Sequence, residues 1–107
     1  MGVKIQKDRK KLTAFIQGEV DHHSAAFIRN EIDSALCQAR PSLLVLDFSE
    51  VTFMDSSGIG LVMGRYKLIK SIGGEIRVEN LSPSAYKIMH LAGVERLGEI
   101  RQKETIQ

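Results

Sequence analysis

The sequence has too few cysteines for disulfides or thiolate metal sites, and it has no long apolar run. Of its 107 residues, one is cysteine and none is tryptophan. A single cysteine excludes an intramolecular disulfide and a zinc site made of several thiolates, and Cys37 is expected to be a small packing residue within a helix. No window reaches the roughly 20 apolar residues that span a bilayer, and the first residues lack the apolar run of a signal peptide. We therefore expect a cytoplasmic protein with no membrane segment.

An excess of charge of one sign is also missing. Fifteen lysine and arginine residues stand against thirteen aspartate and glutamate residues, a formal net charge of +2. The one basic cluster, from Lys7 to Lys11, lies between two strand-like segments, and no aromatic residues that could stack on bases are interleaved with it. This cluster indicates a solvated hairpin turn, and we expect no nucleic acid partner.

The length and the 43% of apolar residues are typical of one globular domain, which we predict over residues 1–107. Alternation of apolar and polar residues predicts a hairpin of strands over 3–7 and 12–17. The segment 18–24 interrupts this pattern, and Ser24 is expected to cap a helix that ends near Ala39. Phe27 lies beside the apolar stripe of that helix, where it either widens the buried face, the favoured alternative, or sits half exposed where a partner docks.

The second half of the chain alternates strands with helices. The run Leu43–Leu46 predicts a strand covered on both faces, and Asp47 is expected to end it. A helix is predicted from about Ser57 to Ile72, then a strand over 75–79 and a helix that opens at Ser82-Pro83 and stops at Gly93. Residues 94–107 have no assignment. This order predicts an α/β fold, a mixed sheet whose later strands are parallel and are joined by helical crossovers.

Two glycines, Gly60 and Gly64, lie one turn apart on the helix predicted after Ser57. Because an interior glycine costs roughly 1 kcal/mol relative to alanine, both are expected to permit close approach of a neighbour. That neighbour is either the sheet or another protein.

The stretch Asp55-Ser56-Ser57-Gly58 places a carboxylate and two hydroxyls at the predicted start of this helix. Residues of these types commonly cap helices, because their short side chains accept hydrogen bonds from the free N–H groups of the first turn. A hydroxyl at this place is also accessible to a modifying enzyme, and a phosphate on it would meet free N–H groups and the positive end of the helix dipole. The residue types alone favour capping.

Catalytic and cofactor motifs are weak or missing. Ser56, two aspartates (Asp21 and Asp55) and three histidines (His22, His23 and His90) supply the residue types of a hydrolytic triad, but no Gly-x-Ser-x-Gly surrounds Ser56. His22 and His23 are adjacent and point in different directions, which does not suit a metal pair. Neither glycine-rich nucleotide-binding motif is present, so we expect no metal, no cofactor and no catalytic residues.

Four blocks of the sequence carry a family resemblance: residues 18–24, residues 53–60, Gly64-Arg65-Tyr66-Lys67 and Gly73-Gly74-Glu75. In their order and spacing they closely resemble the bacterial anti-sigma-factor antagonists of the STAS domain family. The adjacent histidines after Asp21 and the Gly-Arg-Tyr-Lys block are more similar to the sporulation antagonist than to the general-stress one. One small departure is Ile59, which stands where leucine is common.

This resemblance implies a STAS-like domain that works as a binding switch. Family members displace a sigma factor from an anti-sigma factor that is also an ATP-dependent serine kinase. The kinase, which carries the ATP or ADP, phosphorylates the antagonist, and a protein serine phosphatase restores it. The resemblance assigns the phosphate to Ser56, a capping role to Ser57, and partner contacts to the following residues: Asp21, His22, His23, Asp55, Ser57, Gly58, Ile59 and Gly60.

One alternative is a STAS-like domain that binds a nucleotide or another small ligand as a sensor. An independent hydrolase ranks third.

Overall fold

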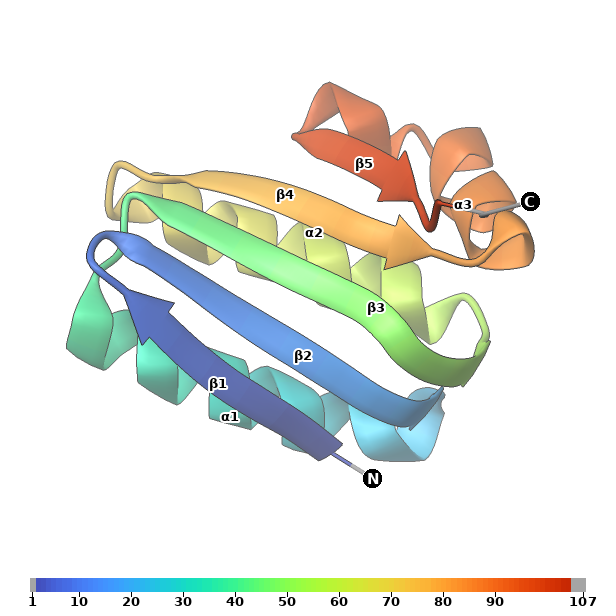
Figure 1. The fold of residues 1–107 in the computed structure, drawn as a ribbon, viewed down its shortest axis with the longest axis horizontal. Helices are drawn as coiled ribbons and strands as arrows, with labels where there is room; N and C mark the ends of the chain where they lie inside the picture. The colour runs from blue at the N-terminus through green and yellow to red at the C-terminus, as the bar shows by residue number, and fades with distance from the viewer. Residues whose placement is uncertain (1, 105–107) are drawn as a thin grey trace.

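The computed structural model describes residues 2–104, and Figure 1 shows their arrangement. Within this range lie strands, α-helices and one 3-10 turn, in the order β1 (Gly2–Asp8), β2 (Lys11–Val20), α1 (His22–Ala39), β3 (Leu43–Met54), α2 (Ser57–Ser71), β4 (Glu75–Leu81), α3 (Pro83–Leu91), η1 (Val94–Arg96) and β5 (Glu99–Gln102). The predicted α/β fold is confirmed. The prediction of one domain over 1–107 extends to residue 1 and residues 105–107, which lie outside the described range.

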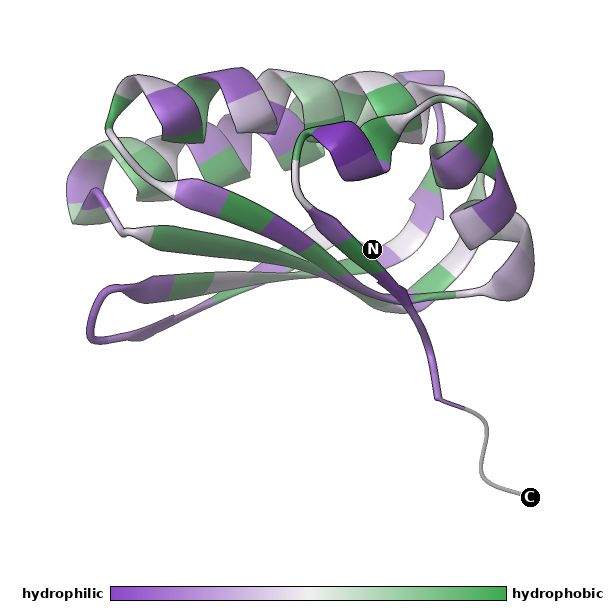
Figure 2. Cartoon of the chain, turned by 90° about the horizontal axis from the view of Figure 1, so that it is seen from above, coloured by the Kyte–Doolittle hydropathy of each residue, from purple (hydrophilic) through white to green (hydrophobic). Residues whose placement is uncertain are grey.

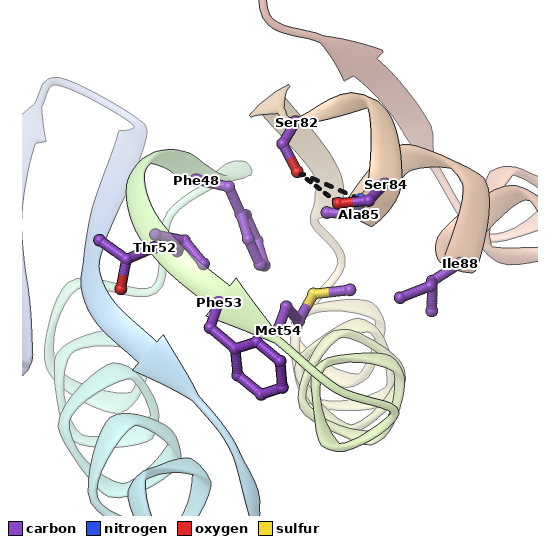
Figure 3. A pocket seen from close by; sticks show the side chains of 9 residues that line it. Phe48, Thr52, Phe53, Met54, Ser82, Ser84, Ala85 and Ile88 are labelled. Atoms are coloured by element: carbon purple, nitrogen blue, oxygen red, sulfur yellow. Dashed lines mark hydrogen bonds between the residues drawn. The ribbon is translucent and has the colours of Figure 1, made fainter.

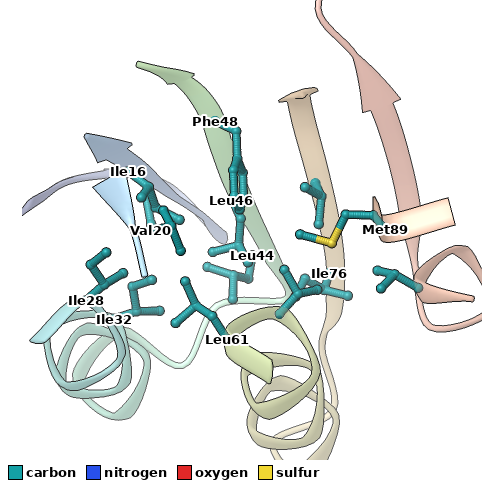
Figure 4. Close-up of a cluster of buried hydrophobic side chains, with 14 of the residues drawn as sticks. Ile16, Val20, Ile28, Ile32, Leu44, Leu46, Phe48, Leu61, Ile76 and Met89 are labelled. Carbon is teal, nitrogen blue, oxygen red and sulfur yellow. The ribbon is translucent and has the colours of Figure 1, made fainter. Parts of the chain in front are cut away.

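The sheet has the strand order β1-β2-β3-β4-β5. Strands β1 and β2 form the predicted antiparallel hairpin, and every later pair is parallel. Figure 2 shows the helices gathered over one face of the sheet, while the other face is left open. The main apolar core lies between these two layers, where α1 and α2 pack on side chains of the central strands (Figure 4), including Ile16, Leu44, Leu46 and Ile76.

Strand β3 is longer than predicted. It continues through Asp47 because the Asp47 carboxylate accepts hydrogen bonds from the Ser49 N–H (2.8 Å) and from Asn80 Nδ2 (2.8 Å). A satisfied carboxylate can remain within a sheet. The prediction of a strand covered on both faces is confirmed, because the consecutive residues from Leu44 to Phe48 are all buried, although the helices lie over only one face. Val45 is buried outside the main core, between its register partners Thr13 and Arg77.

Strand β2 also runs beyond its predicted end. Two register shifts, one between Phe15 and Gln17 and one between Gly18 and Glu19, mark bulges that absorb the irregular stretch. Gly18 has a φ of 85°, which only glycine adopts readily. The strand therefore reaches Val20, and helix α1 begins at His22 with Asp21, not Ser24, as its N-cap.

Three other expectations for the helices were wrong or are now decided. Cys37 is exposed and does not pack in the core. Phe27 is 54% exposed, so the favoured prediction that it widens the buried face was wrong, and its side chain is half exposed as in the other alternative. A Cβ added at Gly60 or Gly64 would meet nothing within 4 Å, so these glycines do not serve close approach of the sheet.

The segment without a sequence assignment forms η1 and β5. Strand β5 extends the sheet beside β4, with Arg77 opposite Glu99 and Val78 opposite Ile100. An ion pair between Arg77 Nε and Glu99 (3.2 Å) joins the two strands on the open face. Hydrogen bonding and charge thus hold a strand with only one buried apolar residue, Ile100.

Candidate functional site

The candidate site lies at the edge of the sheet where the parallel strands β2 and β3 end. Val20 and Met54, the last residues of these strands, are register partners, and the Asp55 N–H donates to the Val20 carbonyl (3.1 Å). Because parallel strands end at the same edge, the start of α1 and the start of α2 become neighbours. The structure thus brings together Asp21 and Ser56, which lie far apart in the sequence.

Ser56 occupies the N-cap position of α2, yet its side chain makes no capping hydrogen bond. The Asp55 carboxylate caps the helix instead, since its Oδ1 accepts a hydrogen bond from the Ser57 N–H at 2.7 Å. The expectation that Ser57 caps the helix was therefore wrong. The Ser56 side chain is exposed, and no hydrogen bond within residues 2–104 engages its hydroxyl.

The N–H groups at the start of α2 are already in use. Besides the Ser57 N–H, the Gly58 N–H donates to the Asp55 carbonyl (3.1 Å) and the Ile59 N–H to the Ser56 carbonyl (3.1 Å). A phosphate on Ser56 would therefore not find a free donor in the N–H groups of Ser57, Gly58 or Ile59. It would add negative charge beside the Asp55 carboxylate, at an exposed residue.

Asp21 is held firmly by the start of α1. Its Oδ1 accepts the N–H groups of His23 and Ser24, both at 2.9 Å, while the Asp21 N–H donates to Ser24 Oγ (3.0 Å), which completes a capping box. The bond from the Ser24 N–H is the main cause that lowers the pKa of Asp21 below its usual value, with a smaller effect from His23. Asp21 is therefore a fixed carboxylate at this edge.

We expect Asp21→Asn to separate the charge of this residue from its capping. Asparagine also caps well, so Asp21→Asn should lose less thermal stability than Asp21→Ala, which removes the acceptor. Because the pKa of Asp21 is lowered in the folded state, its carboxylate stabilises the fold above the ordinary pKa near 3.8 and loses this effect as the pH falls through the lowered value. Thermal unfolding between pH 2 and pH 7 should show a shallower acid dependence for Asp21→Asn than for wild type. If the thermal stability of Asp21→Asn and of wild type depended equally on pH, this prediction would be wrong.

The other predicted contact residues lie around these two caps. His22 and His23 are exposed, with ring centroids 5.8 Å apart. Gly60 is exposed and Ile59 half-buried on the first turns of α2, whereas Gly58 is buried against Met54, whose side chain a Cβ at Gly58 would overlap. Gly58 is therefore a packing residue, and the accessible surface is made by its neighbours.

Two grooves lie at this edge of the sheet. One, of about 340 Å³, lies at the start of α1 and is lined by Gly2, Glu19, Asp21, His23, Ser24, Phe27 and Ile28. The other, of about 400 Å³, lies between the end of β3 and the start of α3, and Figure 3 shows its walls. Residues that line the second groove carry no charge: Phe48, Val51, Thr52, Phe53, Met54, Ser82, Ser84, Ala85 and Ile88. This groove offers no cation to the phosphates of a nucleotide.

The residues of the suspected triad do not form the hydrogen-bonded chain of a triad in the described structure. His90 lies on α3, where its Nδ1 is 2.7 Å from Glu95 and its ring stacks on Tyr86. Since no hydrogen bond joins Ser56 to a histidine within the described residues, the pairing of nucleophile and base that hydrolysis requires is not formed there. Residues 2–104 also hold no group of three or more metal-binding side chains, and none of their helices is long and apolar enough to cross a membrane.

Comparison with known proteins identifies relatives of this chain. The family model for the STAS domain matches residues 3–105. The chain is 32% identical over 102 residues to an anti-sigma F factor antagonist of Paenibacillus polymyxa, covering 95% of this chain and 87% of the relative. It is 27% identical over 103 residues to the anti-sigma-B factor antagonist of Bacillus subtilis, covering 96% and 93% of the two chains.

Solved structures agree with the fold. The anti-sigma factor antagonist SpoIIAA in its unphosphorylated form superposes with a TM-score of 0.79 at 29% identity, over 92% of this chain and 86% of that one. SpoIIAA of Bacillus in its phosphorylated form gives a TM-score of 0.72 at 29% identity, over 92% and 89% of the two chains. The fold described above is therefore shared with a protein that has been solved in both states.

Proposed function

This chain belongs to the STAS domain family, and on that premise we propose that it is an anti-sigma factor antagonist controlled by phosphorylation of Ser56. The unmodified protein binds an anti-sigma factor and thereby releases a sigma factor. The anti-sigma factor is also a serine kinase, which transfers a phosphate from its own ATP to Ser56. A protein serine phosphatase then restores the binding form. The protein is thus a cytoplasmic regulator and a substrate of enzymes, and its likeness to SpoIIAA supports a role in sporulation.

One observation carries this proposal. Asp55 caps the start of α2, and the Ser56 hydroxyl is therefore exposed and without a hydrogen bond in the described structure. A kinase can therefore reach Ser56 without breaking the cap. That SpoIIAA is known in a phosphorylated and an unphosphorylated form, both similar in fold to this chain, supports a modification that does not require refolding.

Electrostatics explains how one phosphate would end binding. A phosphoserine adds about −1.5 to −2 charges at neutral pH, and on Ser56 it would stand beside the carboxylate of Asp55, with Asp21 on the neighbouring junction. A partner surface that fits the neutral hydroxyl would then face repulsion and the cost of removing water from a dianion. A loss of about 3 kcal/mol weakens affinity roughly a hundredfold.

A pair of titrations distinguishes this function from the alternative of a ligand sensor. We expect calorimetry to show a complex with the purified anti-sigma F factor of the same organism, and only weak heats with ATP, ADP, GTP or GDP alone. The uncharged groove beside Ser56 is the physical reason to expect weak nucleotide binding. Tight nucleotide binding without a protein partner, and no complex with the anti-sigma factor, would reverse this conclusion in favour of the sensor.

A further inference from the structure

The surface around Ser56 extends to a third junction, which the sequence did not indicate. Strands β2, β3 and β4 are parallel neighbours, so the segments that follow them emerge at one edge of the sheet. The first carries Asp21, the second carries Ser56, and the third is Ser82-Pro83 at the start of α3. Because β3 lies between the other two strands, Ser56 has a neighbouring junction on each side.

The uncharged groove joins the second junction to the third. Its β3 wall ends at Met54, two residues before Ser56, and its other wall is the start of α3, with Ser84 and Ile88 (Figure 3). Met54 also contacts the first turn of α2, since its side chain fills the space next to Gly58. The groove therefore borders the first turn of α2, the helix whose N-cap position Ser56 occupies.

The chemistry of the groove selects what can enter it. Aromatic and aliphatic side chains make up most of the lining, Phe53 remains 54% exposed at the edge, and the polar groups are short hydroxyls. The Ser82 hydroxyl is already engaged, since it accepts the Ala85 N–H (3.2 Å) and lies 3.3 Å from Ser84 Oγ. A charged group would lose water there without gaining a partner, whereas an apolar side chain would not.

We propose that this groove receives an apolar side chain of the anti-sigma factor that phosphorylates Ser56, so that α3 is part of the docking surface. The inference rests on the function proposed above. An enzyme that reaches the Ser56 hydroxyl must cover its immediate surroundings, and those surroundings include the groove. A buried apolar anchor surrounded by weaker contacts is the usual source of affinity at protein interfaces. A phosphate on Ser56 would place its charge next to this water-free contact.

Substitutions at exposed positions test the groove without disturbing the core. Ser84→Trp places a ring at the α3 wall, and Thr52→Glu places a charge at the β3 wall; both wild-type residues are exposed. We expect each variant to bind the purified anti-sigma F factor of the same organism at least about tenfold more weakly in calorimetry, with unchanged thermal unfolding. Lys87→Trp is the matched control, because it adds the same ring to an exposed position of α3 outside the groove, and it should bind like wild type.

The outcomes separate the two proposals. If wild type binds the anti-sigma factor and both groove variants bind equally well with their folds intact, the groove is not part of the interface, and the proposed function stands. If Lys87→Trp weakens binding as much as Ser84→Trp does, the specific role of the groove is refuted as well. If wild type itself does not bind, the proposed function fails before the groove is tested.

Discussion

Ser56→Ala is expected to abolish phosphorylation and to leave the protein bound to its anti-sigma factor in the presence of ATP. The variant lacks the only hydroxyl that we assign as acceptor, while the cap of α2, which Asp55 provides, remains in place. Its thermal stability should therefore match that of wild type. Mass spectrometry after incubation with the kinase and ATP measures the modification, and co-elution from a sizing column measures the persistent complex.

Ser57→Ala is the matched control, since it removes the neighbouring hydroxyl from the same turn. Its backbone N–H still donates to Asp55, so folding and phosphorylation of Ser56 should both continue. Ser56→Glu, which adds one negative charge, is expected to bind at least about tenfold more weakly than wild type. A phosphate located on Ser57, or a modified Ser56→Ala protein, would show that the acceptor is assigned to the wrong residue.

Asp33→Asn is expected to cost the fold about 2 kcal/mol of unfolding free energy. Arg65 is 6% exposed between α1 and α2, and its Nε lies 2.7 Å from Asp33 Oδ1. Within residues 2–104, the buried Nη1 atom of Arg65 has no hydrogen-bond partner, so the ion pair with Asp33 is what compensates the charge of the guanidinium. Burial lowers the pKa of Arg65, and the positive charge of Arg29 lowers it further, whereas the negative charge of Asp33 raises it. Removing the Asp33 charge would leave a buried guanidinium uncompensated, although the partial exposure of Asp33 makes the cost smaller than for a fully buried pair.

Arg65→Met should be much less harmful than Asp33→Asn, because it removes the buried charge and leaves a carboxylate that water can reach. Adding Asp33→Asn to Arg65→Met should then cost little. Denaturant unfolding of wild type, the two single variants and the double variant measures the coupling between the two charges. Additive effects would mean that the ion pair contributes nothing measurable to the packing of α1 on α2.

The sequence predicts best where a local rule admits one solution. Ser82-Pro83 was placed correctly as the start of α3, because proline fits the first turn of a helix and little else inside it, and the Ser82 hydroxyl caps that turn. The start of α1 was predicted three residues late. Asp21 and Ser24 are both good caps, and the choice between them depends on where the bulged strand β2 ends, which no local pattern reveals.

The sequence predicted that Asp55, Ser56 and Ser57 lie at the start of a helix, but it did not predict which of them caps that helix. Asp55, Ser56 and Ser57 all suit a helix start, so composition could not tell that the Asp55 carboxylate holds the Ser57 N–H and frees Ser56. The α3 side of the groove escaped prediction because its residues are far from Ser56 in the sequence and meet it only through the parallel order of the strands. Strand β5 was missed since four residues with one buried side chain form no periodic pattern.

The order of the strands has a consequence for how the molecule forms. Each strand pairs only with the strands that precede and follow it in the chain, from β1 to β5. The first hairpin can form from local contacts, and every later strand adds to the free side of the one before it. No strand has to insert between two that are already paired, so the sheet can assemble in the order in which a ribosome releases the chain, and the edge that carries Ser56 is built before the last strand arrives.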